Sequence, residues 1–164
     1  MVSVIQQESI TKAEEQIAEK RQSINYDTIA FDIEDMVKYL EEDKIYVPDY
    51  HRGLIWDVTR QSRFIESIFL GLPIPPLFVA EIRDSGRLEI IDGSQRVRCL
   101  AEFMTNKLQL TNLTTLDTLN GFSFSNFSPS LQRKFKHGYS IRIIILSDTN
   151  EMIKNDMFNR INNN

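Results

Sequence analysis

Cysteine and histidine are scarce in this chain of 164 residues, which has one cysteine and two histidines. A single cysteine excludes a disulfide framework, and two well-separated histidines add too few ligands for a Cys/His zinc cluster. No apolar run approaches the roughly 20 residues of a membrane span, and the polar stretch from Gln6 to Gln22 is unlike a signal peptide. We therefore expect a cytoplasmic protein with no protein-bound metal and no membrane partner.

Several signatures of catalysis are absent as well. The sequence has no Walker A motif, no Rossmann GxGxxG and no HExxH. Cys99 falls on an expected helix and forms no recognisable pattern of nucleophilic catalysis with His51 or His137. This favours an inert, partly buried thiol at Cys99 over a nucleophile.

The composition is that of a globular protein, with 41% hydrophobic and 26% charged residues. A net charge of −4 argues against a protein that coats nucleic acid through its overall field, although local basic patches stay open. We expect an N-terminal helical extension over residues 1–24 and a single domain over residues 25–164.

Apolar periodicity and capping residues predict a mixture of helices and strands. Helices are expected at about 11–21, 33–40, 58–70, 94–104 and 129–137, and a last helix opens with Asp148 and Glu151 and reaches Ile161. Strands are expected at 45–47, 77–82, 87–91 and 140–146. The segment 108–120 is weakly patterned and is expected to be loop with short strand pieces. Interspersed helices and strands predict an α+β fold.

The stretch from Ile90 to Leu100 passes from strand to helix through Asp92 and Gly93. Such a turn leaves the first amides of the helix free to bind an anion, and glycine lets a phosphate approach the backbone. Arg96 can add a charge-assisted contact. The alternative is ordinary turn chemistry with Arg96 as a solvated charge. Asp92 can either cap the helix or position a magnesium-bound water.

Four stretches in this order resemble the N-terminal domain of GmrSD-type, modification-dependent restriction proteins. Residues 48–56 match the family pattern PDFQR…W, 64–76 an IESLLLGLPIPP-like run, 91–96 the motif DGQQR, and 157–162 an FxRIN element. The resemblance spans about 26–162 and implies a fold similar to that of ParB and sulfiredoxin.

The resemblance implies that the chain binds a nucleoside triphosphate with Mg²⁺ and acts in antiphage restriction, with hydrolysis left open. It assigns catalysis to Asp92 and Gln95. The nucleotide-binding residues that it implies are Asp49, Arg52, Gly93, Ser94, Gln95 and Arg96. Supporting roles fall to His51, Glu66, Arg160 and Asn162.

Three departures from the family pattern matter. Ser94 replaces the usual glutamine, at the position where sulfiredoxins carry their catalytic cysteine, which excludes sulfiredoxin chemistry and makes hydrolysis less certain. His51 replaces the glutamine beside Arg52. The family's C-terminal helical and nuclease parts are absent from these 164 residues, so we expect no DNA cleavage by them.

A second hypothesis is a non-catalytic module that binds DNA or a protein, as partner or decoy of a full-length restriction protein or with a nuclease or other effector chain. It is based on a group of arginines in an otherwise acidic chain: Arg52, Arg60, Arg63, Arg96 and Arg98. DNA phosphates could use the same helix start as a nucleotide. Trp56 is expected to be a core anchor rather than a base-stacking platform.

Overall fold

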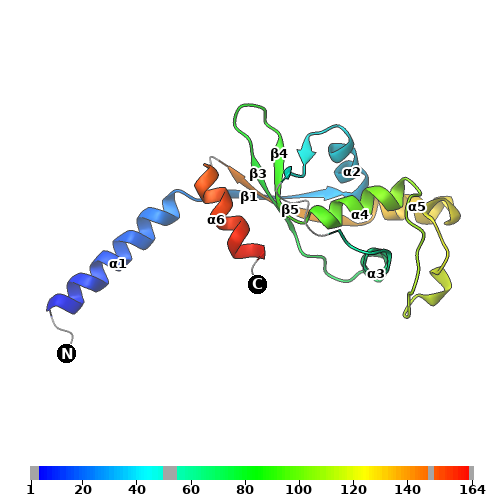
Figure 1. Ribbon diagram of the computed structural model, residues 1–164, viewed down its shortest axis with the longest axis horizontal. Coiled ribbons are helices and arrows are strands. Elements are labelled where there is room, and N and C mark those ends of the chain that lie inside the picture. Colours follow the sequence, from blue (N-terminus) through cyan, green and yellow to red (C-terminus); the bar gives the residue numbers. More distant parts are fainter. Residues whose placement is uncertain (1–3, 50–54, 148–149, 163–164) are drawn as a thin grey trace.

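A five-stranded mixed sheet forms the centre of the computed structural model, which describes residues 4–49, 55–147 and 150–162 (Figure 1). The strand order is β1-β5-β3-β4-β2. β1 is antiparallel to β5, β5 is parallel to β3, β3 is antiparallel to β4, and β4 is parallel to β2. The strands are β1 (Asn25–Asp32), β2 (Ile45–Tyr46), β3 (Leu77–Glu81), β4 (Leu88–Asp92) and β5 (Ser140–Ser147).

Six α-helices lie in the described part of the chain, and most begin where the capping residues predict. The helices are α1 (Val4–Gln22), α2 (Ile33–Glu41), α3 (Val58–Phe69), α4 (Ser94–Met104), α5 (Pro129–His137) and α6 (Glu151–Asn162). The side chains of Asp32, Asp57 and Ser128 cap α2, α3 and α5 by accepting a hydrogen bond from the amide three residues on. These elements confirm the α+β class.

Two corrections concern the beginning of the chain. Helix α1 begins at Val4 rather than near residue 11. Strand β1 was not predicted, since residues 25–30 are all exposed and therefore show no alternation of apolar and polar positions. Asp148, which was expected to open the last helix, lies outside the described residues; α6 begins at Glu151, and the Asn150 side chain accepts a hydrogen bond from the Ile153 amide at 2.8 Å.

The main core lies between one face of the sheet and the helices α2, α3, α4 and α5, which gather at one end of the molecule in Figure 1. Phenylalanines dominate it: Phe103 and Phe135 are fully buried with ring centroids 5.2 Å apart, and Phe69 stacks on Phe127 at 5.1 Å. The period of 3.6 residues places the apolar side chains of each helix toward this face.

A smaller apolar cluster on the opposite face packs under α6. Ala80, Ile91 and Leu146 supply its buried residues. Beside it, the Lys154 ammonium of α6 is almost fully buried and pairs with the Glu89 carboxylate of β4. This ion pair connects α6 to the sheet.

The segment after α4 contains no strand between Leu108 and Asn120, contrary to the expected strand pieces. Its backbone is held by side chains instead: Ser62 accepts from the Thr111 amide and Glu66 from the Leu116 amide. Two short 3-10 turns follow, at Asp117–Leu119 and Phe124–Asn126.

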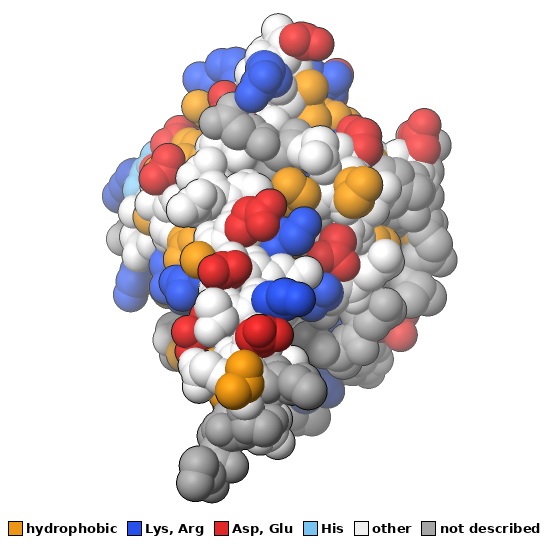
Figure 2. Space-filling model, turned by 90° about the vertical axis from the view of Figure 1, so that its left-hand side faces the viewer, with side chains coloured by type: hydrophobic (Ala, Val, Ile, Leu, Met, Phe, Trp, Pro, Cys, Tyr) orange, Lys and Arg blue, Asp and Glu red, His pale blue; other side chains and the backbone are white. Residues whose placement is uncertain are grey.

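Helix α1 leads away from the rest of the structure (Figure 1). Every residue of α1 whose exposure is described is exposed. Figure 2, seen from the side on which α1 projects, shows acidic and basic side chains interspersed there with scattered hydrophobic ones. Among the described residues, no helix combines the length and the apolar character needed to cross a bilayer.

Candidate functional site beside helix α4

The turn between β4 and α4 is built around Gly93. Its φ of +110° lies in a region that residues with a side chain rarely adopt, and it is the N-cap residue of α4. A Cβ at this position would collide with the side chain of Leu77, the first residue of β3. The same Cβ would lie 3.0 Å from Nη2 of Arg96, so the turn packs closely against both side chains.

No side chain caps the first turn of α4. The interpretation of Asp92 as a helix cap is therefore wrong. Its carboxylate lies toward Arg96 instead, with Oδ2 at 3.5 Å from Nη2. The uncapped amides carry the positive end of the helix dipole, which favours negative charge nearby.

Arg96 extends from this first turn toward the segment that precedes β3. Its Nη2 donates a hydrogen bond to the Pro76 carbonyl at 3.0 Å. Its Nε is buried and finds no hydrogen-bond partner among the residues that the structure describes. A buried unsatisfied donor costs about 1–3 kcal/mol, so this guanidinium is only partly satisfied by the protein.

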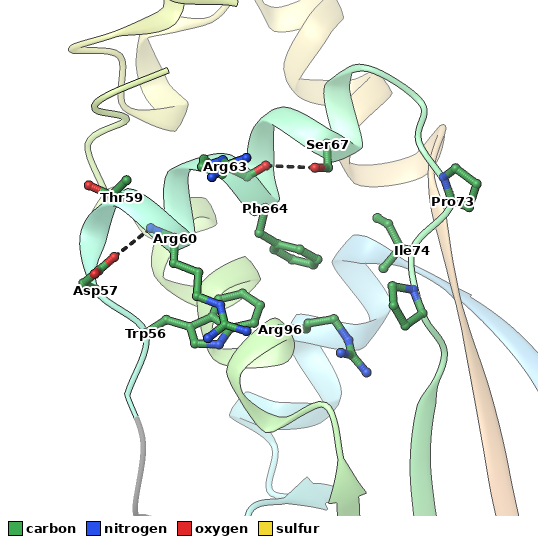
Figure 3. Close-up of a pocket in the computed structure, with 11 residues that line it drawn as sticks. Trp56, Asp57, Thr59, Arg60, Arg63, Phe64, Ser67, Pro73, Ile74 and Arg96 are labelled. Carbon is green, nitrogen blue, oxygen red and sulfur yellow. Dashed lines mark hydrogen bonds between the residues drawn. The ribbon is translucent and has the colours of Figure 1, made fainter. Parts of the chain in front are cut away.

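A cavity of about 620 Å³ opens beside Arg96 (Figure 3). One wall is α3, the other is the extended Pro73–Pro75 segment, and Arg96 lies between them. The residues that line it are Trp56, Asp57, Thr59, Arg60, Arg63, Phe64, Ser67, Pro73, Ile74, Pro75 and Arg96.

Three guanidinium groups and two aromatic rings give the cavity its chemical character. The Arg60 guanidinium lies over the Trp56 ring, 4.8 Å from its centroid, and Trp56 contacts Phe64 edge to face at 5.5 Å. Arg63 stands one helical turn from Arg60 and is exposed. Within the described ranges neither Arg60 nor Arg63 forms an ion pair, which leaves both cations available to an anionic ligand.

Gln95 joins the start of α4 to the segment that leads into α3. Its Oε1 accepts a hydrogen bond from the Trp56 amide at 3.0 Å. The bond spans 39 positions of the chain and brings the motif of α4 beside Trp56 and its neighbours. Ser94, the first residue of α4, is half-buried in the same turn.

Among the described residues that the resemblance suggests, Arg96 alone lines this cavity; Asp92, Gly93, Ser94 and Gln95 form the neighbouring turn but are not among the lining residues. Glu66 is buried against the loop after α4, where its Oε2 accepts from the Leu116 amide at 2.8 Å. Arg160 is exposed on α6 and pairs with Asp156 at 2.9 Å. Asp49 is exposed.

Part of the predicted site cannot be placed. His51 and Arg52 lie outside the described residues, and so does the side chain of Asn162.

Arg96 was predicted for the nucleotide site, whereas Arg60 and Arg63 entered only the arginine group of the alternative DNA- or protein-binding hypothesis, and Trp56 was expected in the core. Arg60 and Arg63 lie at the start of α3, where the helix dipole disfavours cations, and this is the signal that an anion could face them. Their meeting with Arg96 depends on how α3 packs against α4, which the sequence does not state.

No other chemistry competes with this cavity in the described residues. They contain no group of three or more potential metal ligands. Cys99 is fully buried, and this burial raises the pKa of its thiol well above the ordinary value. The negative charge of Glu102 raises the pKa further, by a smaller amount. A thiol held protonated in this way is a poor nucleophile.

The fold and cavity define a small α+β domain with an arginine-lined, aromatic-walled cavity next to an uncapped helix start. The sequence model of the family described as "GmrSD restriction endonuclease, N-terminal domain" matches residues 33–164. The chain belongs to this family, which links it to antiphage restriction systems. No curated protein matches the chain significantly.

Proposed function

We propose that this domain binds a nucleoside triphosphate in the cavity between α3, α4 and the Pro73–Pro75 segment. The observation that carries the proposal is that three arginine residues, Arg60, Arg63 and Arg96, line one cavity together with aromatic side chains. Family membership supports a role in restriction, and nucleotide binding is our extension of it.

The phosphates are assigned to the end of the cavity nearest α4. Arg96 has a buried Nε without a partner, and the amides that follow Gly93 are uncapped. Charge-assisted hydrogen bonds from a guanidinium are the strongest that a protein offers a phosphate, and helix amides add to them. Arg60 and Arg63 then supply countercharge from α3.

The nucleobase is assigned to the apolar wall. Trp56, Phe64 and Ile74 offer flat and apolar surface, and base stacking on aromatic rings is favourable for any base. This wall alone does not select adenine, guanine or cytosine.

Hydrolysis is the finer part of the proposal. Mg²⁺ would arrive with the triphosphate, and Asp92 supplies the carboxylate at the turn. Gln95 keeps its side-chain amide donors while its Oε1 accepts from Trp56. Catalysis of phosphoryl transfer then rests on positioning and charge stabilisation. Release of inorganic phosphate, compared between wild type and the Asp92→Asn and Gln95→Ala variants, tests this part separately from binding.

Binding is tested by titration calorimetry with ATP, GTP and CTP, each with and without Mg²⁺. Trp56 is the single tryptophan of the chain, so its fluorescence reports on this cavity directly. Arg96→Ala is expected to weaken binding by about 1.5–3 kcal/mol, roughly ten- to a hundred-fold in Kd. Arg133→Ala, which removes an exposed arginine of α5, is the matched control and should bind as wild type does.

Two results would count against the proposal. One is the absence of heat and of a Trp56 fluorescence change with all three nucleotides at millimolar concentration. The other is equal affinity of the wild type and Arg96→Ala proteins, provided that the variant keeps the wild-type circular dichroism spectrum.

The same cavity leaves a second candidate, a module that binds DNA or an effector chain. Exposed Arg60 and Arg63 favour it, because cations without ion-pair partners also suit backbone phosphates. Duplex binding that weakens steeply with salt and is unaffected by nucleotide would support this reading. Competition between DNA and triphosphate would support a shared phosphate site.

A further inference from the structure

Strand β1 is a long, unprotected edge of the sheet. It is the first strand in the order β1-β5-β3-β4-β2, and its eight residues pair with β5 without a break in register. Natural proteins protect such edges with proline, bulges or charged side chains; Asn25–Asp32 contains no proline and no bulge, and its charged residues are Asp27 and, at its end, Asp32. Tyr26 is 64% and Ile29 39% exposed, on opposite faces of the strand. The edge is therefore suited to pairing with another strand.

Helix α1, which precedes β1, is exposed at every residue whose exposure the structure describes. Ile10, Ala13 and Ile17 follow one another at spacings of three and four residues, which places them on one face of the helix. All three are exposed, Ile17 to 59%. A narrow apolar stripe on a projecting helix is typical of a contact with a partner.

We propose that β1 pairs antiparallel with β1 of a second copy of this chain, and that α1 packs along the second copy. The two five-stranded sheets then form one continuous sheet across a two-fold axis. This proposal is independent of nucleotide binding.

Charge indicates that the occupant is a second copy in the antiparallel direction. The last turn of α1 carries Lys20 and Arg21, just before β1. The first turn of α2 carries Glu34 and Asp35, just after β1. Antiparallel pairing places the basic start of each strand beside the acidic end of the other, whereas parallel pairing would bring like charges together.

The strand sequence also permits this pairing. A two-fold axis at Thr28 or at Ile29 places Asp27 opposite Ile29 or Phe31 of the second copy, both uncharged. Pairing centred on Asp27 itself would oppose two carboxylates and is disfavoured. Charge thus limits the register to the middle of the strand.

The area available fits a specific dimer. The eight-residue edge is about 27 Å long and the 19-residue helix about 28 Å long. Each chain contributes three strips about 10 Å wide: the edge of β1, its own helix α1, and the surface that α1 of the second copy covers. Together they come to about 800 Å² per chain, the size of a standard interface. The strand edge alone would be too small, so α1 is part of the proposal.

The test is sedimentation velocity of the 164-residue chain and of two charge-reversal variants. One variant is Lys20→Glu with Arg21→Glu, and the other is Glu34→Lys with Asp35→Lys. We expect a wild-type dimer at tens of micromolar and a loss of affinity of about ten-fold or more in each variant. Mixing the two variants should restore the dimer, since each basic segment then meets an acidic one at both ends.

Arg83→Glu with Lys107→Glu is the matched control for the Lys20→Glu, Arg21→Glu variant, because it lowers the net charge by the same amount at two exposed positions away from β1. It should dimerise as the wild type does. A wild-type chain that stays monomeric at several hundred micromolar overturns the proposal. So does a dimer that neither reversal weakens, or a mixture of folded variants that fails to associate.

Discussion

Replacing Gly93 with alanine probes the turn on which the candidate site depends. Two independent costs are expected. The φ of +110° is strained for any residue with a Cβ, at about 1–2 kcal/mol. The new methyl group also collides with the Leu77 side chain, and overpacking of this kind costs about 1–3 kcal/mol more. We expect Gly93→Ala to lower the free energy of unfolding by about 2–5 kcal/mol.

Gly86→Ala is the matched control for backbone strain alone. Gly86 has a φ of +70°, and a Cβ there would meet nothing within 4 Å. Its substitution should cost only about 1 kcal/mol. The difference between the two variants in urea denaturation reports the contacts of the new methyl group, chiefly with Leu77 and also with Nη2 of Arg96 at 3.0 Å.

A double-mutant cycle tests the cause of that difference. Leu77→Ala removes the colliding atoms, so Gly93→Ala should cost less in its presence than in the wild-type background, although Leu77→Ala is itself destabilising. Equal losses for Gly93→Ala and Gly86→Ala, or strict additivity with Leu77→Ala, would refute the close approach of β3 to this turn.

Two further predictions concern charges that hold helices in place. Lys154→Met should destabilise the protein by about 3 kcal/mol in urea denaturation, because it leaves Glu89 buried and unpaired; adding Glu89→Gln should recover part of the loss, and an unchanged loss would contradict the pairing. Burial acts to raise the pKa of Asp32, but hydrogen bonds from the Asp35 amide and His137 outweigh it and lower the pKa below the usual 3.8. The stability that Asp32 adds is therefore fully present above pH 3.8 and is lost as the pH falls through the lowered pKa of the folded protein. The advantage in stability of the wild type over Asp32→Asn should shrink below about pH 4. An advantage that does not change between about pH 2 and 6 would contradict this.

The family was recognisable from the order of short motifs, and the match over residues 33–164 confirms it. The likeness to ParB and sulfiredoxin folds stays a prediction, as do the domain boundary at residues 24–25 and the roles of the nucleotide and Mg²⁺. Motifs identify a family because they record which residue types recur. They do not state what each side chain contacts.

The sequence determined the elements whose signals are local. Helices α2, α3 and α5 and the β3–β4 hairpin were predictable because their signals act within a few residues. These signals are apolar periodicity, the caps at Asp32, Asp57 and Ser128, and the glycines after α3 and in the β3–β4 turn. β1 was not, because an exposed edge strand needs no apolar alternation; its place is decided by pairing with β5, more than 100 positions away.

Only the tertiary structure decided the candidate site. It brings Leu77 against Gly93, directs Arg96 to the Pro76 carbonyl, and sets Arg60 and Arg63 across the cavity from the Pro73–Pro75 segment. These contacts join elements far apart in the chain, and they follow from the packing of the core rather than from any local preference. The residue types at the turn were visible in the sequence, but which of them bond to the protein and which face the cavity depends on that packing.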